Sequence, residues 1–474
     1  MEKTVHIIGA GLAGSEAALQ LASRGVRVHL SEMRPERQTA VHAGGRCAEL
    51  VCSNSLKSVK PDSAAGMLKS ELAALDSFLL REARGASVAA GGALAVDRDA
   101  FSDGVTRLVR EHPLIDYAVE EISDPLACAD ADGRPFDATI IATGPLTSDA
   151  LAAWIAEATG SDNLAFYDAA APIVMADSLD MGVLFRQSRY EDDAPGDYLN
   201  APFDKETYEA FIEQLVGAER VVARDFETRD LFQACQPIEE IARKGADAPR
   251  FGTCKPVGLT DPATGRRPWA AVQLRAENAQ GTAYNLVGFQ TNLTFPEQRR
   301  VFRMIPGLEN AEFARYGVMH RNTFIQAPKL LSRDLRLRAN GGAAVVEGSG
   351  EDAAALALSS AASPLFVAGQ LSGTEGYCEA IASGLMAALF AYAALAGIEA
   401  PMPPKETAFG ALLDYATDPA TVGYQPMHVN FGILPPFERR IRNKRERYAA
   451  YASRGAEAMD AYVARLRAEG LMRP

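Results

Sequence analysis

Two cysteines of this 474-residue chain stand in contexts that suit a reactive thiol, and Cys52 is the first of them. It follows the apolar pair Leu50-Val51 and precedes Ser53-Asn54-Ser55 and Lys57, which are helix-capping residues and a cation. Backbone donors and positive charge lower the pKa of a thiol because they stabilise the thiolate, which is the nucleophilic form. The context of Cys52 therefore suits covalent catalysis.

Cys235 is the second candidate thiol. Pro237 suits the first position of a helix, so Cys235 is expected just ahead of a helix N-terminus, where the helix dipole stabilises a thiolate. Glu239 and Glu240 act in the opposite direction, because negative charge raises the pKa of a thiol. For either cysteine taken alone, packing as a small buried side chain is the more common role.

The cysteines as a set indicate neither disulfides nor a metal site. Six are too few for a disulfide framework in a chain of this length, so reduced thiols are expected. No second Cys or His pair at zinc-binding spacing accompanies Cys47 and Cys52, so no structural metal is expected. The six cysteines are Cys47, Cys52, Cys128, Cys235, Cys254 and Cys378.

A glycine-rich turn at the start of the chain is the first element that must position this chemistry. Residues 5–8 are an apolar strand, and the three glycines after it fit the pattern G-x-G-x-x-G. Glycines in this pattern allow a tight turn, a close approach of the backbone to pyrophosphate, and packing of the helix against the strand. We expect the turn to bind a dinucleotide through Gly9, Ala10, Gly11, Leu12, Ala13 and Gly14.

A helix and a second strand follow the turn in the order that such a site requires. The apolar positions of residues 15–24 keep helical spacing, Gly25 suits a helix C-cap, and residues 26–30 form an apolar strand. Glu32 ends this strand and is placed to accept hydrogen bonds from ribose hydroxyls. Because strand, glycines, helix, strand and acid occur in order, an ordinary glycine-rich turn is the weaker interpretation.

Two later segments resemble the FAD-binding domain of two-dinucleotide flavoproteins. Residues 137–144 form an apolar strand ending in Ala-Thr-Gly, and residues 364–376 form a strand that leads into glycines. The resemblance implies FAD as the cofactor, with Gln370 in the place of an acid that many relatives use on the ribityl chain. The sequence contains no second G-x-G-x-x-G, so we expect no dedicated NAD(P)H domain. The implied FAD contacts are Thr143, Gly144, Gly369, Gly373, Glu375 and Gly376.

The separation of these segments predicts the architecture. We expect an α/β fold with a discontinuous Rossmann-like FAD-binding domain, an inserted α/β domain and a mostly helical C-terminal tail. The FAD-binding domain is expected to comprise residues 1–150 and 317–400, the insert residues 151–316, and the tail residues 401–474. Cys52 then lies in the FAD-binding domain and Cys235 in the insert, so the active site is expected at their interface.

The composition is that of a soluble, cytoplasmic enzyme. The chain is 48% hydrophobic and 23% charged, which allows a large core, and it lacks the pattern of a secretory signal. Residues 380–398 carry no charge over nineteen positions, about the length of a bilayer span. They are rich in Ala, Gly and Ser and follow the third flavin segment, so we expect a buried helix and no membrane partner.

The overall charge argues against a general nucleic-acid binder, but two local segments are basic. The formal net charge is −13 and the isoelectric point is about 5.1. Residues 439–447 carry six basic residues and one acid, and Arg299, Arg300 and Arg303 form a second cluster. Either segment is able to neutralise phosphates. For residues 439–467, a solvated helix face is the favoured alternative.

Taken together, the motifs closely resemble the bacterial folate- and FAD-dependent tRNA uracil-5 methyltransferases, from the start of the chain to about residue 435. That family is similar to the flavoproteins that install carboxymethylaminomethyl groups on wobble uridines. The resemblance rests on the glycine fingerprint with Ser31-Glu-Met-Arg-Pro35, Glu49-Leu-Val-Cys-Ser-Asn-Ser55, Gly91-Gly-Ala-Leu-Ala-Val-Asp-Arg98, Cys235-Gln-Pro-Ile-Glu-Glu240, Lys255-Pro-Val-Gly-Leu259, Gly288-Phe-Gln-Thr291 and Tyr316-Gly-Val-Met-His-Arg-Asn-Thr323.

The resemblance implies methylation of carbon 5 of the T-loop uridine of tRNA. Family members take a methylene group from methylenetetrahydrofolate, carry it on reduced FAD and complete the methyl group with hydride, and NAD(P)H is the reductant. Cys52 and Cys235 align with the family's paired catalytic cysteines. One thiolate adds to carbon 6 of uracil, and the other thiol is a candidate for removing the carbon 5 proton. Which cysteine has which role is left open.

The resemblance also implies a folate site. His320 corresponds to the family position that closes a stack of pterin on flavin, and Arg321 is a candidate partner for the folate glutamate tail. On local grounds alone, a hydrogen-bonded loop histidine is an equally good interpretation of His320. Three other functions stay open: a wobble-uridine or ribosomal RNA modification enzyme, a protein that binds FAD and tRNA without turnover, and a plain flavin oxidoreductase.

Overall fold

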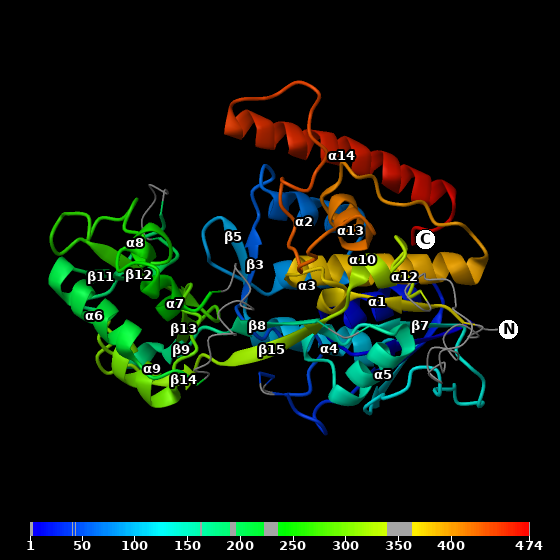
Figure 1. Cartoon of the computed structure of the whole chain (residues 1–474), viewed down its shortest axis with the longest axis horizontal. Helices are drawn as coiled ribbons and strands as arrows, with labels where there is room; N and C mark the ends of the chain where they lie inside the picture. The colour runs from blue at the N-terminus through cyan, green and yellow to red at the C-terminus, as the bar shows by residue number, and fades with distance from the viewer. Residues whose placement is uncertain are drawn as a thin grey trace.

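The computed structural model describes residues 3–39, 41–42, 44–161, 164–189, 196–221, 236–338 and 363–473. The chain forms a larger lobe that contains both termini and a smaller lobe built from the middle of the sequence (Figure 1). The predicted α/β fold with a helical C-terminal segment is confirmed. Each lobe has its own hydrophobic core.

A five-stranded parallel sheet forms the centre of the larger lobe. β1 lies in the middle of the order β16-β7-β1-β2-β6, and every neighbouring pair is parallel. β7 and β16 come from segments far downstream of β1, so the domain is discontinuous in sequence. The strands are β1 (Thr4–Ile8), β2 (Arg27–Glu32), β6 (Ile115–Val119), β7 (Ala138–Ile141) and β16 (Leu365–Val367).

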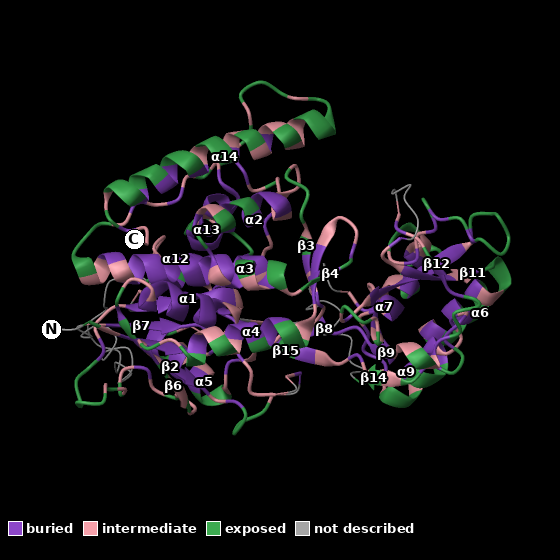
Figure 2. Cartoon of the chain, turned by 180° about the vertical axis from the view of Figure 1, so that it is seen from behind, coloured by how far each residue is buried: buried purple, intermediate pink, exposed green. Residues whose placement is uncertain are grey.

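Two helices, α1 (Leu12–Ala22) and α12 (Tyr377–Ala396), pack against each other over this sheet. α12 is long and apolar enough to cross a membrane, but 78% of its most apolar window is buried inside the protein. Figure 2 shows the burial along most of its length. The charge-free segment is therefore a core helix, as the sequence predicted. α5 (Asp149–Thr159) adds Leu151 and Ile155 to the same core.

Further helices enclose the larger lobe. The C-terminal helix α14 (Lys444–Ala468) begins at Asn443, whose side chain accepts hydrogen bonds from two backbone amides of the first turn. Its buried residues include Tyr451, Met459 and Leu466, which recur at helical spacing, so one face packs and the other stays exposed. The others are α2 (Ala64–Ala74), α3 (Phe78–Gly85), α4 (Arg98–Arg110), α10 (Ala327–Leu330) and α13 (Ala408–Thr417).

The smaller lobe contains a six-stranded sheet in the order β10-β11-β12-β13-β9-β14, and all its pairs are antiparallel. Aromatic side chains such as Phe211, Phe289 and Phe302 fill the core between sheet and helices. The strands are β9 (Ile173–Met175), β10 (Phe185–Arg186), β11 (Leu199–Phe203), β12 (Ala270–Ala276), β13 (Ala283–Leu286) and β14 (Phe313–Arg315). The helices are α6 (Lys205–Gly217), α7 (Ile238–Arg243), α8 (Ala248–Phe251) and α9 (Phe295–Phe302).

Two small sheets lie where the lobes meet. β8 (Leu164–Ala169) and β15 (Met319–Phe324) pair antiparallel and carry the chain between the lobes (Figure 1). The second sheet has the order β3-β5-β4, formed by Ser55–Ser58, Ala93–Val96 and Ser87–Val88. The candidate site lies between these connections and the parallel sheet.

Candidate functional site

A cavity of about 340 Å³ begins at the carboxyl ends of the parallel strands. In open parallel sheets this edge is where ligands bind, because loops and helix N-termini meet there. The cavity extends from the glycine turn after β1 to Cys52 and to His320 on β15. The fold thus brings the predicted dinucleotide turn, the first predicted thiol and the predicted folate residue to one cavity.

The glycine turn has the geometry of a phosphate-binding cradle. Gly9 has a φ of +99°, which favours glycine. A Cβ atom at Gly14 would lie 1.8 Å from the Gly9 carbonyl oxygen, so only glycine lets α1 approach the turn this closely. Gly9, Gly11, Leu12 and Ala13 line the cavity, whereas Ala10 and Gly14 shape the turn from behind.

Glu32 lies at the end of β2 and also lines the cavity. Its carboxylate accepts hydrogen bonds from the Ala10 amide at 2.9 Å and from the Arg34 Nε at 2.9 Å. Burial opposes ionisation, but the hydrogen bonds and charge of Arg34 outweigh it and lower the pKa of Glu32. Glu32 is therefore an ionised acceptor that the glycine turn and Arg34 hold in place.

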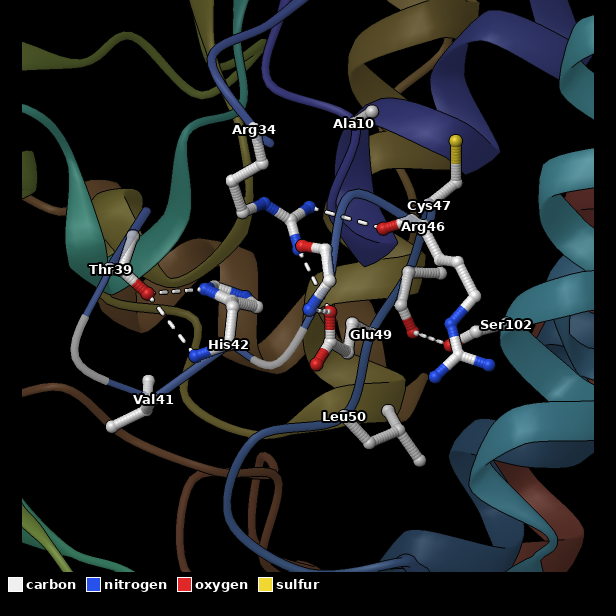
Figure 3. A network of polar contacts seen from close by, with 12 residues as sticks. Ala10, Arg34, Thr39, Val41, His42, Arg46, Cys47, Glu49, Leu50 and Ser102 are labelled. Atoms are coloured by element: carbon white, nitrogen blue, oxygen red, sulfur yellow. Dashed lines mark hydrogen bonds and ion pairs between the residues drawn. The ribbon is translucent and has the colours of Figure 1, made fainter. Parts of the chain in front are cut away.

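The loop that follows β2 is organised around Arg34 (Figure 3). The guanidinium donates to Glu49 at 3.2 Å and to the Arg46 carbonyl at 3.2 Å, which connects β2 to the segment before Cys52. His42 lines the cavity and contacts Thr39 at 2.7 Å. Burial, together with the charge of Arg34, lowers the pKa of His42 to about 3, so this ring is neutral.

The two later flavin segments supply the far wall. The lining residues among those predicted are Thr143, Gly144, Gly369, Glu375 and Gly376, and Gly373 does not line the cavity. The Gln370 side chain donates to the Glu375 carboxyl. Burial, then the charge of Asp168, raises the pKa of Glu375 to about 8. The pair Gln370 and Glu375 thus presents a neutral, hydrogen-bonded surface to the cavity around pH 7.

Cys52 is half-buried, and Tyr377 at the start of α12 holds its backbone. The Tyr377 hydroxyl accepts hydrogen bonds from the Cys52 amide at 3.0 Å and the Ser53 amide at 3.1 Å. Burial and the nearby Cys52 raise the pKa of Tyr377, so the phenol stays protonated. The sequence does not predict this contact, because Tyr377 is 325 positions from Cys52 and belongs to no chemical motif of its own.

Arg98 supports the Cys52 segment from the other side. It donates to the Leu50 carbonyl at 2.6 Å and pairs with Glu277 of the smaller lobe at 2.6 Å. Asn54 makes a second connection, since its side chain donates to Ala276 and accepts from Arg275. The segment that carries Cys52 is therefore part of the junction between the lobes.

Cys235 lies outside the described residues, so its role and its pairing with Cys52 stay predictions. α7 begins at Ile238 with Pro237 as its N-cap, one position later than predicted. Both acids expected to oppose a thiolate are engaged elsewhere. Glu239 accepts from the Asn292 amide and the Thr291 hydroxyl, and Glu240 pairs with Arg220 at 2.7 Å.

The two residues predicted for folate lie on opposite faces of β15. His320 is buried and lines the cavity, with its Nε2 atom 4.0 Å from a carboxylate oxygen of Asp168. Burial lowers the pKa of His320, although Asp168 opposes this effect, and the ring is neutral. Arg321 is exposed and is not among the lining residues. Its assignment to folate stays a prediction.

The basic side chains of the two segments differ in whether they have partners within the protein. Arg300 pairs with Glu297 at 2.7 Å, Arg303 donates to the Ala311 carbonyl, and Arg299 donates to the Tyr316 hydroxyl. Five basic side chains are exposed in the loop that precedes α14 and in the first turn of this helix. No carboxylate of the described residues pairs with them. These five are Arg439, Arg440, Arg442, Lys444 and Arg445, called the basic segment below.

The fold and the cavity together define a flavoprotein. A parallel sheet, a glycine cradle that a Cβ atom would fill and an ionised acid after the second strand fit FAD. Gly9, Gly11, Glu32, Thr143 and Gly369 are the residues that would hold it.

Comparison with known proteins narrows this class. The family model described as "Glucose inhibited division protein A" matches residues 4–343 and 354–399. A methylenetetrahydrofolate–tRNA-(uracil-5-)-methyltransferase TrmFO of Pelotomaculum thermopropionicum is 49% identical over 460 residues, which cover 97% of this chain and 98% of that protein. A protein of the same name from Geobacter sulfurreducens is 48% identical over 464 residues, covering 98% and 100%. The chain belongs to the family of methylenetetrahydrofolate–tRNA-(uracil-5-)-methyltransferases, within the glucose inhibited division protein A family.

The solved structures agree on the fold. GidA of Aquifex aeolicus, in its form II crystal, matches with a TM-score of 0.65 and 15% identity, over 98% of this chain and 74% of that protein. The form I crystal gives the same TM-score at 16% identity. The resemblance that the sequence motifs indicated is confirmed.

Proposed function

We propose that this chain methylates carbon 5 of the T-loop uridine of tRNA, with methylenetetrahydrofolate as the carbon source and FAD as the cofactor. One observation carries the proposal: Cys52 and the dinucleotide turn line the same cavity. Family membership at 49% identity over 97% of the chain supports the reaction. When bound, FAD supplies transfer of the one-carbon unit and the hydride that completes the methyl group.

The thiol chemistry follows from the weak nucleophilicity of carbon 5 of uracil. A thiolate that adds to carbon 6 forms a carbon–sulfur bond and places negative charge on carbon 5 and the carbonyl oxygen. Carbon 5 then attacks the one-carbon unit. Removal of the carbon 5 proton breaks the bond between this unit and its carrier and leaves an exocyclic methylene group, and hydride addition to this group completes the methyl group and expels the thiolate. Cys52 and Cys235 are the proposed pair for these two tasks, with their division left open.

Tyr377 and Arg98 are the residues that position Cys52 in this proposal. Tyr377 fixes the two backbone amides at Cys52 and Ser53, and Arg98 fixes the carbonyl of Leu50. A nucleophile held within a few tenths of an ångström loses little entropy in reaching its target. The described contacts therefore favour a preorganised thiol.

His320 is the proposed surface for the pterin ring of folate. Its neutral ring lines the cavity, and a flat aromatic side chain is suited to stacking on a second flat ring. We assign NAD(P)H as the reductant, and no step of the proposed reaction requires a metal ion. We also infer that the protein works in the cytoplasm, where its tRNA substrate is found.

The basic segment is the proposed tRNA contact outside the cavity. Its charges are exposed and are not neutralised by described carboxylates, unlike those of Arg300. Phosphates of tRNA would release counterions when they bind there. The uridine itself must leave its stack to reach Cys52, because the thiol lines a cavity and not an open surface.

The direct test incubates the holoenzyme with a tRNA transcript, methylenetetrahydrofolate labelled in its methylene carbon, and NAD(P)H. Labelled 5-methyluridine at the T-loop position, located by mass spectrometry of nuclease fragments, is the expected result. Label at a wobble position or in ribosomal RNA would reassign the enzyme within the family. Oxidation of NAD(P)H without any labelled nucleoside would point to a plain flavin oxidoreductase and refute the proposal.

A further inference from the structure

Two histidines and a glutamate from separate segments meet beside the parallel sheet. His6 on β1 and His29 on β2 are partners in the register of two parallel strands, so their side chains share one face. Glu120 follows the end of β6 on the other side of β2. One ring nitrogen of each histidine and a carboxylate oxygen of Glu120 lie within 4.8 Å of one another.

The hydrogen bonds show how the cluster is arranged. His29 contacts Glu120 at 2.9 Å through Nε2 and Asp116 at 2.8 Å through Nδ1. The Ser31 hydroxyl donates to Glu120 at 2.6 Å and contacts His6 Nε2 at 2.8 Å. His6 Nδ1 is buried and has no hydrogen-bond partner within the described parts of the chain.

The electrostatics of the cluster suit a cation. Two carboxylates, Asp116 and Glu120, contact the two ring nitrogens of His29, and the His6 ring lies beside His29 with its centroid 5.4 Å away. Neutral imidazole is the form that binds metals. A divalent ion would balance the charges of both carboxylates.

We propose that His6, His29 and Glu120 form a binding site for a divalent transition-metal ion, with Zn²⁺ as the reference ion. Two imidazole nitrogens and a carboxylate oxygen are a common protein donor set for zinc. Asp116 on the far nitrogen of His29 is the outer carboxylate that orients metal-binding histidines. Phe136 stacks on both rings, at 4.8 and 5.8 Å between centroids, and covers the site with apolar surface.

The geometry requires only a small adjustment. Donor atoms around a tetrahedral zinc ion are separated by about 3.4 Å, so a separation at the 4.8 Å limit of the cluster must shorten by about 1.4 Å. The Glu120 side chain is 41% exposed, so its carboxylate can shift without repacking the core. Ser31 and Glu120 also line the cofactor cavity, so a bound ion would tie β1, β2 and β6 together next to Glu32.

The test measures metal binding directly, apart from methylation. Holoenzyme treated with a chelator is titrated with Co²⁺, and d–d absorption is followed at wavelengths beyond the flavin bands. Zn²⁺ is then counted by mass spectrometry after gel filtration. We expect one ion per chain, an affinity lowered at least tenfold in Asp116→Asn, and loss of binding in His6→Asn and Glu120→Gln.

His112→Asn is the matched control, because His112 lies outside the cluster and should leave binding unchanged. Glu120→Gln is expected to fold, because the Glu120 side chain is partly exposed, so loss of metal binding in this variant reports on the site itself. Wild-type protein that binds neither Co²⁺ nor Zn²⁺ would overturn the proposal. Equal binding by the wild type, His6→Asn and Glu120→Gln would overturn it as well.

Discussion

At the residue scale, the functional proposal depends on the different environments that the fold gives to two cysteines of the cavity. Cys52 and Cys378 both line the cavity, but burial raises the pKa of Cys378 to about 11. Cys378 therefore stays protonated, whereas Cys52 is half-buried and is held by Tyr377 through its backbone. Position in the cavity alone does not make a thiol reactive.

Replacing Cys52 with alanine is expected to reduce tRNA methylation by about 10³-fold or more, because a removed nucleophile has no substitute. FAD occupancy, read from flavin absorbance, should not change, since Cys52 is not part of the glycine cradle. Cys128→Ala is the control, because Cys128 does not line the cavity. A Cys52→Ala enzyme that keeps more than about a tenth of wild-type methylation would contradict the mechanism.

Glu375 predicts a pH effect on stability. Burial raises its pKa from 4.5 to about 8, so the folded protein holds a proton that the unfolded chain releases in this range. The stabilising contribution of the protonated carboxyl is present below about pH 4.5 and is lost as the pH rises towards 8. The Glu375→Gln variant should not show this loss. Its free energy of unfolding should therefore exceed that of the wild type at high pH by an amount on the order of a few kcal/mol, relative to their difference at low pH.

Thermal unfolding of the two proteins across this pH range checks the prediction. The melting temperature of Glu375→Gln should rise relative to that of the wild type as the pH increases from about 5 to 8. Parallel melting curves at every pH would show that Glu375 ionises normally.

At the element scale, the sequence predicted most of the cofactor domain. Strands expected at residues 5–8 and 26–30 are observed as β1 (Thr4–Ile8) and β2 (Arg27–Glu32), because apolar periodicity and glycine turns are local signals. The C-terminal helix was expected from residue 439 but begins at Lys444, since Asn443 caps it. The antiparallel order of the smaller lobe was not predicted, because no local signal encodes which strands pair.

Packing between α1 and α12 is a second feature that only the structure shows. Gly384 lies in α12 against α1, and a Cβ atom there would be 2.1 Å from the Ala13 carbonyl oxygen. The contact is between backbones, so a methyl group cannot be accommodated by rotating a side chain. The close approach places the N-terminal turn of α1 at the cavity.

Gly384→Ala is therefore expected to destabilise the protein by about 1–3 kcal/mol and to weaken FAD binding, since α1 must move. The matched control is Gly85→Ala in α3, where a Cβ atom would meet nothing within 4 Å. This control should be neutral or stabilising by up to about 1 kcal/mol, because alanine favours a helix. Denaturant unfolding and FAD titration measure both effects, and equal behaviour of the two variants would contradict the packing argument.

At the scale of the whole molecule, the two lobes and the basic segment determine how a large RNA reaches a small cavity. Arg98 and Glu277 connect the lobes directly behind the Cys52 segment. The basic segment precedes and begins α14, which lies over the larger lobe in Figure 1. A protein with a negative net charge is thus able to present a locally positive surface.

Replacing both Arg439 and Arg440 with alanine is expected to weaken tRNA binding and to reduce the slope of log K against log salt by up to about 1.8, or about 0.9 for each lost phosphate contact. Arg300→Ala is the matched control, because Glu297 already neutralises that charge. Filter binding at several salt concentrations provides the slopes. An unchanged slope in the double variant would remove the basic segment from the tRNA surface.

The sequence alone determined the cofactor class, the family and the buried helix after the third flavin segment, and it predicted Cys52 as a reactive thiol. These features are encoded by short motifs and by the periodicity of neighbouring residues. The tertiary structure decided which distant groups meet: Tyr377 with the backbone of Cys52, Gln370 with Glu375, and His6 with His29 and Glu120. Such contacts depend on strand order and helix packing, and no local pattern of residues specifies either one.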